Sequence, residues 1–123
     1  MMRNLFVSGL TTLVLISLSL QAQASPEERL EVIYASAEAE TMVTVTNPMF
    51  RPVGNFMMMN VKAQNVSTVA ARFEYKVDWY DQEGFPLKGV SGWQTLILSP
   101  NQVEDLRVAG QVKGAYRARV TVR

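Results

Sequence analysis

Two residue types that carry much of the chemistry in small proteins are missing from this sequence. Its 123 residues contain no His and no Cys. This excludes a His-based catalytic triad, a Cys nucleophile, a zinc site of the usual ligand types and a haem held by His or Cys. Glycoside hydrolysis needs two carboxylates across a cleft, whereas Glu104 and Asp105 are neighbours that should face opposite sides of one strand. Ser67 and Ser91 have no base. We therefore expect a protein that is not an enzyme and that uses no cofactor.

A methionine cluster offers one alternative. Met57, Met58 and Met59 are consecutive, and Met42 and Met49 lie nearby in the sequence. Thioether sulfur is a soft ligand that suits Cu(I). Alternation along a strand would place Met57 and Met59 on one face and Met58 on the other, and methionine also fills gaps in protein cores. A protein that handles Cu(I) or a small ligand through this strand is the alternative function.

Aromatic and basic side chains define a candidate interaction surface. Tyr80 lies off the apolar face of its expected strand and, with Trp93, could anchor a partner, because exposed aromatics are frequent interface hot spots. Arg117 and Arg119 alternate along the outer face of the last expected strand, and Arg123 follows them. Such a row could meet an acidic partner or the carboxylates of a polymer. Alternatively it could protect an edge strand, or pair across the sheet with acids such as Glu74 and Asp78.

Residues 1–24 have the three parts of a secretory signal peptide. A short positive segment precedes the apolar run Leu5 to Leu20, and Ala22-Gln23-Ala24 is an A-x-A cleavage motif. The run is shorter than the roughly 20 residues that cross a bilayer as a helix. We expect cleavage between Ala24 and Ser25 and export to the periplasm, with no stable membrane span in the mature chain.

The expected mature chain is neutral. Of 12 basic residues, Arg3 is lost with the leader, so 11 remain against 11 acidic ones. Such a domain has no electrostatic footprint for nucleic acid or for an anionic membrane surface. Its partners should be envelope proteins, and its oligomeric state is left open.

Alternation of apolar and polar residues dominates from residue 41 onward. It is clearest over 71–81, where Phe73, Tyr75, Val77 and Trp79 alternate with charged residues. Further runs at 41–46, 56–65, 93–98, 103–108 and 115–122 are separated by turn signals, and the first is expected to stop at Asn47-Pro48. The acidic segment 25–40 is either a tether or a first edge strand. Residues 41–123 should form an all-β, antiparallel, immunoglobulin-like β-sandwich of about six to seven strands.

The central hairpin carries a family resemblance. Residues 75–85, with Asn65 to Ser67 before them and the run 93–98 after them, resemble the YcfL-like proteins, small and largely uncharacterised envelope proteins of Gram-negative bacteria. The resemblance implies an immunoglobulin-like sandwich at the cell envelope and no catalytic residues. Its motif positions are expected to be structural: Asn65, Tyr75, Trp79, Asp81 and Gly84. Trp79 should fill the core, Asp81 should cap the hairpin turn, and Gly84 should supply a positive φ.

One departure from that family concerns membrane attachment. Many of its members are lipoproteins, whereas this chain has Ala24 and Ser25 where a lipid-bearing Cys would stand. We therefore expect a periplasmic protein that is not a lipoprotein.

Overall fold

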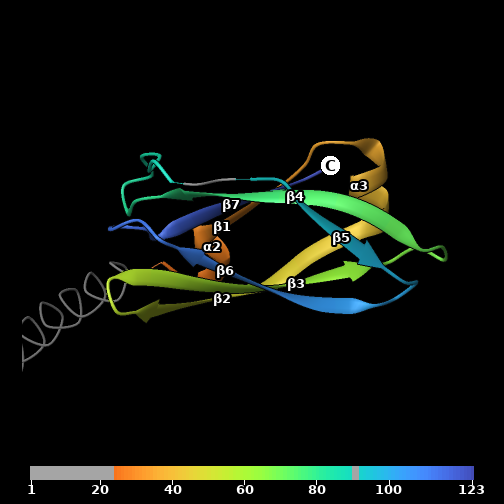
Figure 1. Ribbon diagram of the computed structural model, residues 1–123, viewed down its shortest axis with the longest axis horizontal. Helices are drawn as coiled ribbons and strands as arrows, with labels where there is room; N and C mark the ends of the chain where they lie inside the picture. Colours follow the sequence, from red (N-terminus) through yellow and green to blue (C-terminus); the bar gives the residue numbers. More distant parts are fainter. Residues whose placement is uncertain (1–23, 90–91) are drawn as a thin grey trace, which may run out of the picture.

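The protein is a β-sandwich of two sheets that pack face to face (Figure 1). The computed structural model describes residues 24–89 and 92–123, so most of the expected signal peptide lies outside the described residues. One sheet has four strands in the order β1-β7-β4-β5, and the other has three in the order β2-β3-β6. The strands are β1 (Leu30–Tyr34), β2 (Val43–Val53), β3 (Phe56–Asn65), β4 (Ala71–Tyr80), β5 (Gln94–Leu98), β6 (Val103–Gly110) and β7 (Arg117–Val122). The predicted sandwich of six to seven strands is confirmed.

One strand pair departs from the predicted antiparallel pattern. β1 runs parallel to β7, with Leu30 opposite Ala118 and Tyr34 opposite Val122. All other pairs in the two sheets are antiparallel. A parallel pair needs a long connection between its strands, and here nearly the whole chain separates them.

The acidic segment 25–40 is ordered around two short helices and β1. Helix α2 (Pro26–Arg29) begins at Ser25, and helix α3 (Ala37–Met42) begins at Ser36. Both serines accept a hydrogen bond from a backbone N–H three residues on, as helix-capping residues do. β1 lies between the helices at the edge of the four-stranded sheet, and α3 leads the chain from there to the other sheet. No helix in the described part of the chain is long and apolar enough to cross a membrane.

The predicted end of the first long run at Pro48 is wrong. β2 continues to Val53, and its register with β3 shifts between Thr46 and Met49. Asn47 has a φ of 53°, and Pro48 is buried. The extra residues of a β-bulge leave the ladder locally unpaired, so a proline without an N–H is accommodated there.

The core lies between the two sheets and comes from the alternating positions that the sequence predicted. Ala118, Val120 and Val122 of β7 are at most 3% exposed, and Met59, Val61 and Ala63 of β3 are fully buried. Trp79 of β4 is also buried, and its ring packs edge-on against Phe50 of β2, with the ring centres 6.3 Å apart. These contacts hold the two sheets together. The opposite face of the four-stranded sheet therefore points away from the core.

The outer face of the three-stranded sheet carries an ion pair that can be tested by titration. Lys62 Nζ lies 2.8 Å from Asp105 Oδ1 in the paired strands β3 and β6. Hydrogen bonds from Lys62 and then from Asn60 lower the pKa of Asp105. A lowered folded-state pKa means that the contact contributes above the ordinary carboxyl pKa and is lost as pH falls through the lowered value. In an NMR titration of the Asp105 carboxyl group, we expect Lys62→Met to raise the pH of the titration midpoint, while Lys113→Met leaves it unchanged. Equal midpoints in the unsubstituted protein and both variants would contradict the ion pair between Lys62 and Asp105.

Candidate functional site

The outer face of the four-stranded sheet carries most of the predicted interaction residues. In the register of β4 with β7, Tyr80 is opposite Arg117 and Asp78 is opposite Arg119. These residues alternate with buried Trp79 and Ala118, so they lie on the side of the sheet away from the core. Helices α2 and α3 make their main contacts with β1 and β2 rather than with β4, β5 or β7. The outer face is therefore not the main packing surface of either helix.

Tyr80 is covered on one side by an arginine. The Arg119 guanidinium carbon lies 5.0 Å from the centre of the Tyr80 ring, within cation–π distance. Arg119 Nε also lies 2.6 Å from Glu31 Oε1 of β1. The hydrogen bond to Glu31 raises the pKa of Arg119. Tyr80 is thus held in place by a row that joins β4, β7 and β1.

Trp93 occupies a second aromatic position on the same outer face. Its ring is approached by the Arg123 guanidinium carbon at 3.7 Å and by Lys76 Nζ at 5.2 Å. Trp93 remains 36% exposed. Lys76 and Tyr80 are four residues apart on β4, a distance of about 13 Å along a strand. We call the set Tyr80, Trp93, Lys76, Arg119 and Arg123 the aromatic–cationic face.

The idea that the arginine row protects an edge strand is wrong. β7 lies inside the sheet, between β1 and β4. Cross-sheet pairing is found instead for Arg123, whose Nε lies 3.3 Å from Glu74 Oε1. Asp78 is directly opposite Arg119 in the register but lies 4.0 Å from Lys76 Nζ, while Arg119 pairs with Glu31.

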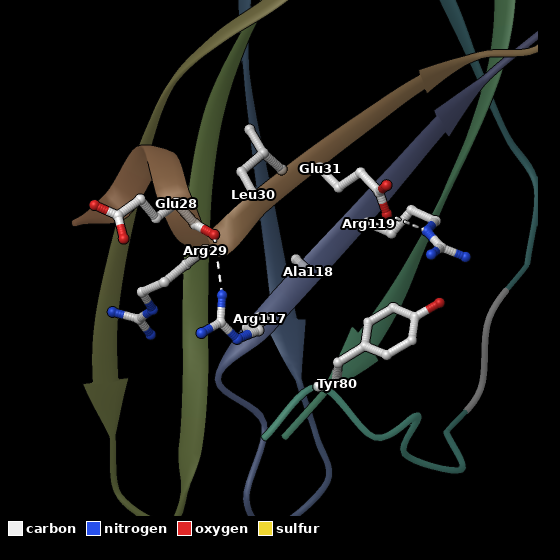
Figure 2. Close-up of a pocket in the computed structure, with 9 residues that line it drawn as sticks. Glu28, Arg29, Leu30, Glu31, Tyr80, Arg117, Ala118 and Arg119 are labelled. Carbon is white, nitrogen blue, oxygen red and sulfur yellow. Dashed lines mark hydrogen bonds and ion pairs between the residues drawn. The ribbon is translucent and has the colours of Figure 1, made fainter. Parts of the chain in front are cut away.

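A cavity of about 220 Å³ opens beside Tyr80, at the end of the sandwich where α2 meets β7 (Figure 2). We call it the arginine cavity, because Arg29, Arg117 and Arg119 line it together with Tyr80. The rest of its lining comprises Glu28, Leu30, Glu31, Gly84 and Ala118. Its walls come from the start, the middle and the end of the chain. The cavity brings together three of the four predicted surface residues, whereas Trp93 lies outside it.

Arg29 was not predicted as a site residue. Its guanidinium carbon lies 4.1 Å from the centre of the Phe50 ring and 3.9 Å from that of Tyr116. Its Nε donates to the Tyr116 carbonyl at 2.9 Å. Burial, followed by the positive charge of Arg117, lowers the pKa of Arg29, although Tyr116 acts in the opposite direction. The sequence signal was a single basic residue within the acidic segment 25–40.

The family-motif residues occupy structural positions around this site. Asp81 Oδ1 accepts hydrogen bonds from the backbone N–H groups of Glu83 and Phe85, and Gly84 has a φ of 93°. Asn65 is fully buried, and its side chain joins the turn after β3 to the end of β5. Tyr75 is half-buried, and burial followed by the charge of Glu104 raises its pKa.

The methionines of β2 and β3 are divided between the two sides of the three-stranded sheet. Met59 is fully buried in the core, and Met57 accepts a contact from Arg29 Nη2 at 3.5 Å. Met58 is opposite Arg51, on the outer side of the same strand, and Met49 is opposite Asn60 and 67% exposed. Met57 and Met59 therefore face the core, whereas Met58 and Met49 face outward, as alternation along the strand predicted for the three consecutive methionines.

Comparison with known proteins gives a family without an assigned function. The family model described as "Protein of unknown function (DUF1425)" matches residues 30–123. No curated protein matches the sequence. The crystal structure of a DUF1425 family member from Shewanella sp. pv-4 is similar in fold, with a TM-score of 0.61 and 23% identity over 66% of this chain and 76% of that one. The crystal structure of Campylobacter jejuni cj0090 is similar with a TM-score of 0.60 and 29% identity over 74% of this chain and 94% of that one.

Proposed function

Given that this chain belongs to the DUF1425 family, whose function is unknown, we propose that it is a non-enzymatic binding module of the cell envelope. In this proposal it contacts a partner protein through the aromatic–cationic face. The YcfL-like resemblance and the expected leader support a periplasmic location. The absence of Cys from the sequence supports a mature protein without a lipid anchor.

One observation carries the proposal: Trp93 and Tyr80 lie on the outer face of one sheet, and cationic side chains pack over both rings. Tyr, Trp and Arg are enriched at interface hot spots. Here the arginines are already ordered by Glu31 and Glu74, at 2.6 Å and 3.3 Å. A surface whose long side chains are held before binding loses less conformational freedom when a partner docks.

The test is site-specific photo-crosslinking in the cells that produce the protein. A benzophenone amino acid replaces Thr95, an exposed residue of β5 between Trp93 and Ile97. The matched control replaces Thr46, an exposed residue of β2 in the other sheet. We expect a discrete adduct from position 95 and none from position 46, with the partner identified by mass spectrometry.

The double variant Tyr80→Ala, Trp93→Ala separates binding from folding. Loss of two interface anchors costs about 2 kcal/mol or more in binding, so we expect the position-95 adduct to fall at least about tenfold. The thermal unfolding transition should remain cooperative, since neither ring belongs to the core. An adduct of unchanged yield in the folded double variant, or an equal adduct from position 46, would refute the proposal.

A further inference from the structure

The arginine cavity contains more positive charge than its neighbours neutralise. Arg119 is paired with Glu31. Of the ion pairs found among residues 24–89 and 92–123, none includes Arg29 or Arg117. Glu28 also lines the cavity, but its carboxylate accepts a hydrogen bond from Ser25 Oγ at 3.1 Å and points away from Arg117 in Figure 2. Two guanidinium groups therefore lack a carboxylate in the described structure.

Neutral groups hold both of these guanidiniums in place. Arg117 Nη1 donates to the Glu28 carbonyl at 3.1 Å, and Arg117 Nε donates to the Gln82 carbonyl at 3.3 Å. Arg29 is fixed by the Tyr116 carbonyl and by the rings of Phe50 and Tyr116. A guanidinium has five N–H donors in a planar fork, so these contacts leave donors for a further acceptor. The cavity is thus organised before a ligand arrives.

Both guanidiniums lie beside the ring of Tyr116. Their central carbons are 3.9 Å and 5.8 Å from the centre of the same Tyr116 ring. Burial is the main cause of the lowered pKa of Arg29, and the positive charge of Arg117 acts in the same direction. An anion in the cavity that both residues line would be attracted by both charges, and bidentate hydrogen bonds from arginine match a carboxylate in shape.

We infer that the arginine cavity binds an Asp or Glu side chain from an acidic segment of the partner protein. The volume of about 220 Å³ is below the 300–1,000 Å³ of typical small-molecule sites and suits one side chain. Tyr80 belongs both to the cavity and to the aromatic–cationic face, so a partner on that face would pass the cavity mouth. The inference rests on the proposed function and names the chemistry of the partner.

The experiment measures binding of an acidic peptide to the purified protein. The full chain is expressed, and the protein is isolated in the form that the cell produces. The probe is a fluorescently labelled hexaglutamate peptide, followed by anisotropy, with hexaglutamine as the uncharged control. We expect binding of hexaglutamate alone, weakened by salt. Arg117→Gln should weaken hexaglutamate binding about tenfold, which is the effect of losing one charge-assisted hydrogen bond. Arg117→Lys keeps the charge but loses the planar fork of N–H donors, so its affinity should lie between those of the unsubstituted protein and Arg117→Gln.

Arg107→Gln is the matched control, since Arg107 is an exposed strand arginine in the other sheet. The inference is overturned if hexaglutamate does not bind at 1 mM protein, if both Gln variants lose affinity equally, or if phosphate displaces the peptide at a lower concentration than glutamate does. Crosslinking from position 95 in the Arg117→Gln background distinguishes the two proposals. If the adduct forms but Arg117→Gln leaves peptide affinity unchanged, only this inference fails. If Arg117→Gln weakens peptide binding but no adduct forms in either background, the proposed function fails.

Discussion

Trp79→Ala is expected to reduce the free energy of unfolding by about 3–5 kcal/mol, a large part of the stability of a domain of this size. Trp79 is only 8% exposed and lies between the sheets, edge-on against Phe50 at 6.3 Å. Its removal would leave a cavity where β4 of one sheet meets β2 of the other. Urea denaturation followed by circular dichroism measures the change.

Trp93→Ala is the matched control, because it removes the same side chain from a position that is 36% exposed. Its contacts are with Arg123 and Lys76 at the surface, so we expect a loss of about 1 kcal/mol. Comparable losses in the two variants would contradict the placement of Trp79 in the core and Trp93 on the aromatic–cationic face.

Gly110→Ala tests the packing around Trp79 from strand β6, which faces the Trp79 ring. A Cβ at Gly110 would lie 2.8 Å from two atoms of the Trp79 ring and 3.0 Å from Ala115 Cβ. Rigid ring atoms cannot move away as a flexible chain end would, so we expect a loss of about 1–3 kcal/mol from overpacking. A neutral effect would show that the ring and β6 are farther apart than the structure has them.

The strands that could be predicted from the sequence are those whose pattern is complete within one segment. In β4 and β7, apolar and polar residues alternate because one face of each strand packs against the core. This alternation can be recognised within the segment itself, without knowing which strands lie beside it. The continuation of β2 past Pro48 could not be predicted in this way, because it depends on a bulge against β3. The parallel pairing of β1 with β7 likewise depends on where the last strand lies.

The candidate site was predictable to the same extent. Tyr80, Arg117 and Arg119 follow from alternation along single strands, and the structure places all three at one cavity. Arg29 could not be found, because its surroundings come from Phe50 and Tyr116, far away in the sequence. Trp93 was proposed together with Tyr80 as an anchor for a partner. Its contact with Lys76, four residues before Tyr80 on β4, could not be predicted, because it depends on the pairing of β5 with β4.

Asn65→Ala is expected to cost about 2–4 kcal/mol, since it would leave several buried polar groups without partners. Asn65 is fully buried, and its Nδ2 donates to the carbonyls of Val69 and Leu98 at 2.8 Å and 3.1 Å. Its Oδ1 accepts from Ser67 N and Oγ. The side chain thereby ties the turn after β3 to the end of β5. Gln64→Ala, a change to the neighbouring amide on the outer side of β3, should alter stability by no more than about 0.5 kcal/mol.

Asn65→Asp tests whether stability depends on the N–H donors of the Asn65 side chain or only on its shape. An ionised carboxylate cannot donate to Val69 and Leu98, and burial disfavours its charge, so the folded variant should have a raised Asp pKa. Because a raised folded-state pKa means that the native state binds the proton more tightly than the unfolded chain, the penalty should be largest at pH 7 and should shrink as pH falls toward 4. We expect the stability difference between Asn65→Asp and the unsubstituted protein, measured by urea denaturation at both values, to follow this order. A difference that is independent of pH would mean that residue 65 is solvated, and the buried link between the turn after β3 and the end of β5 would then be refuted.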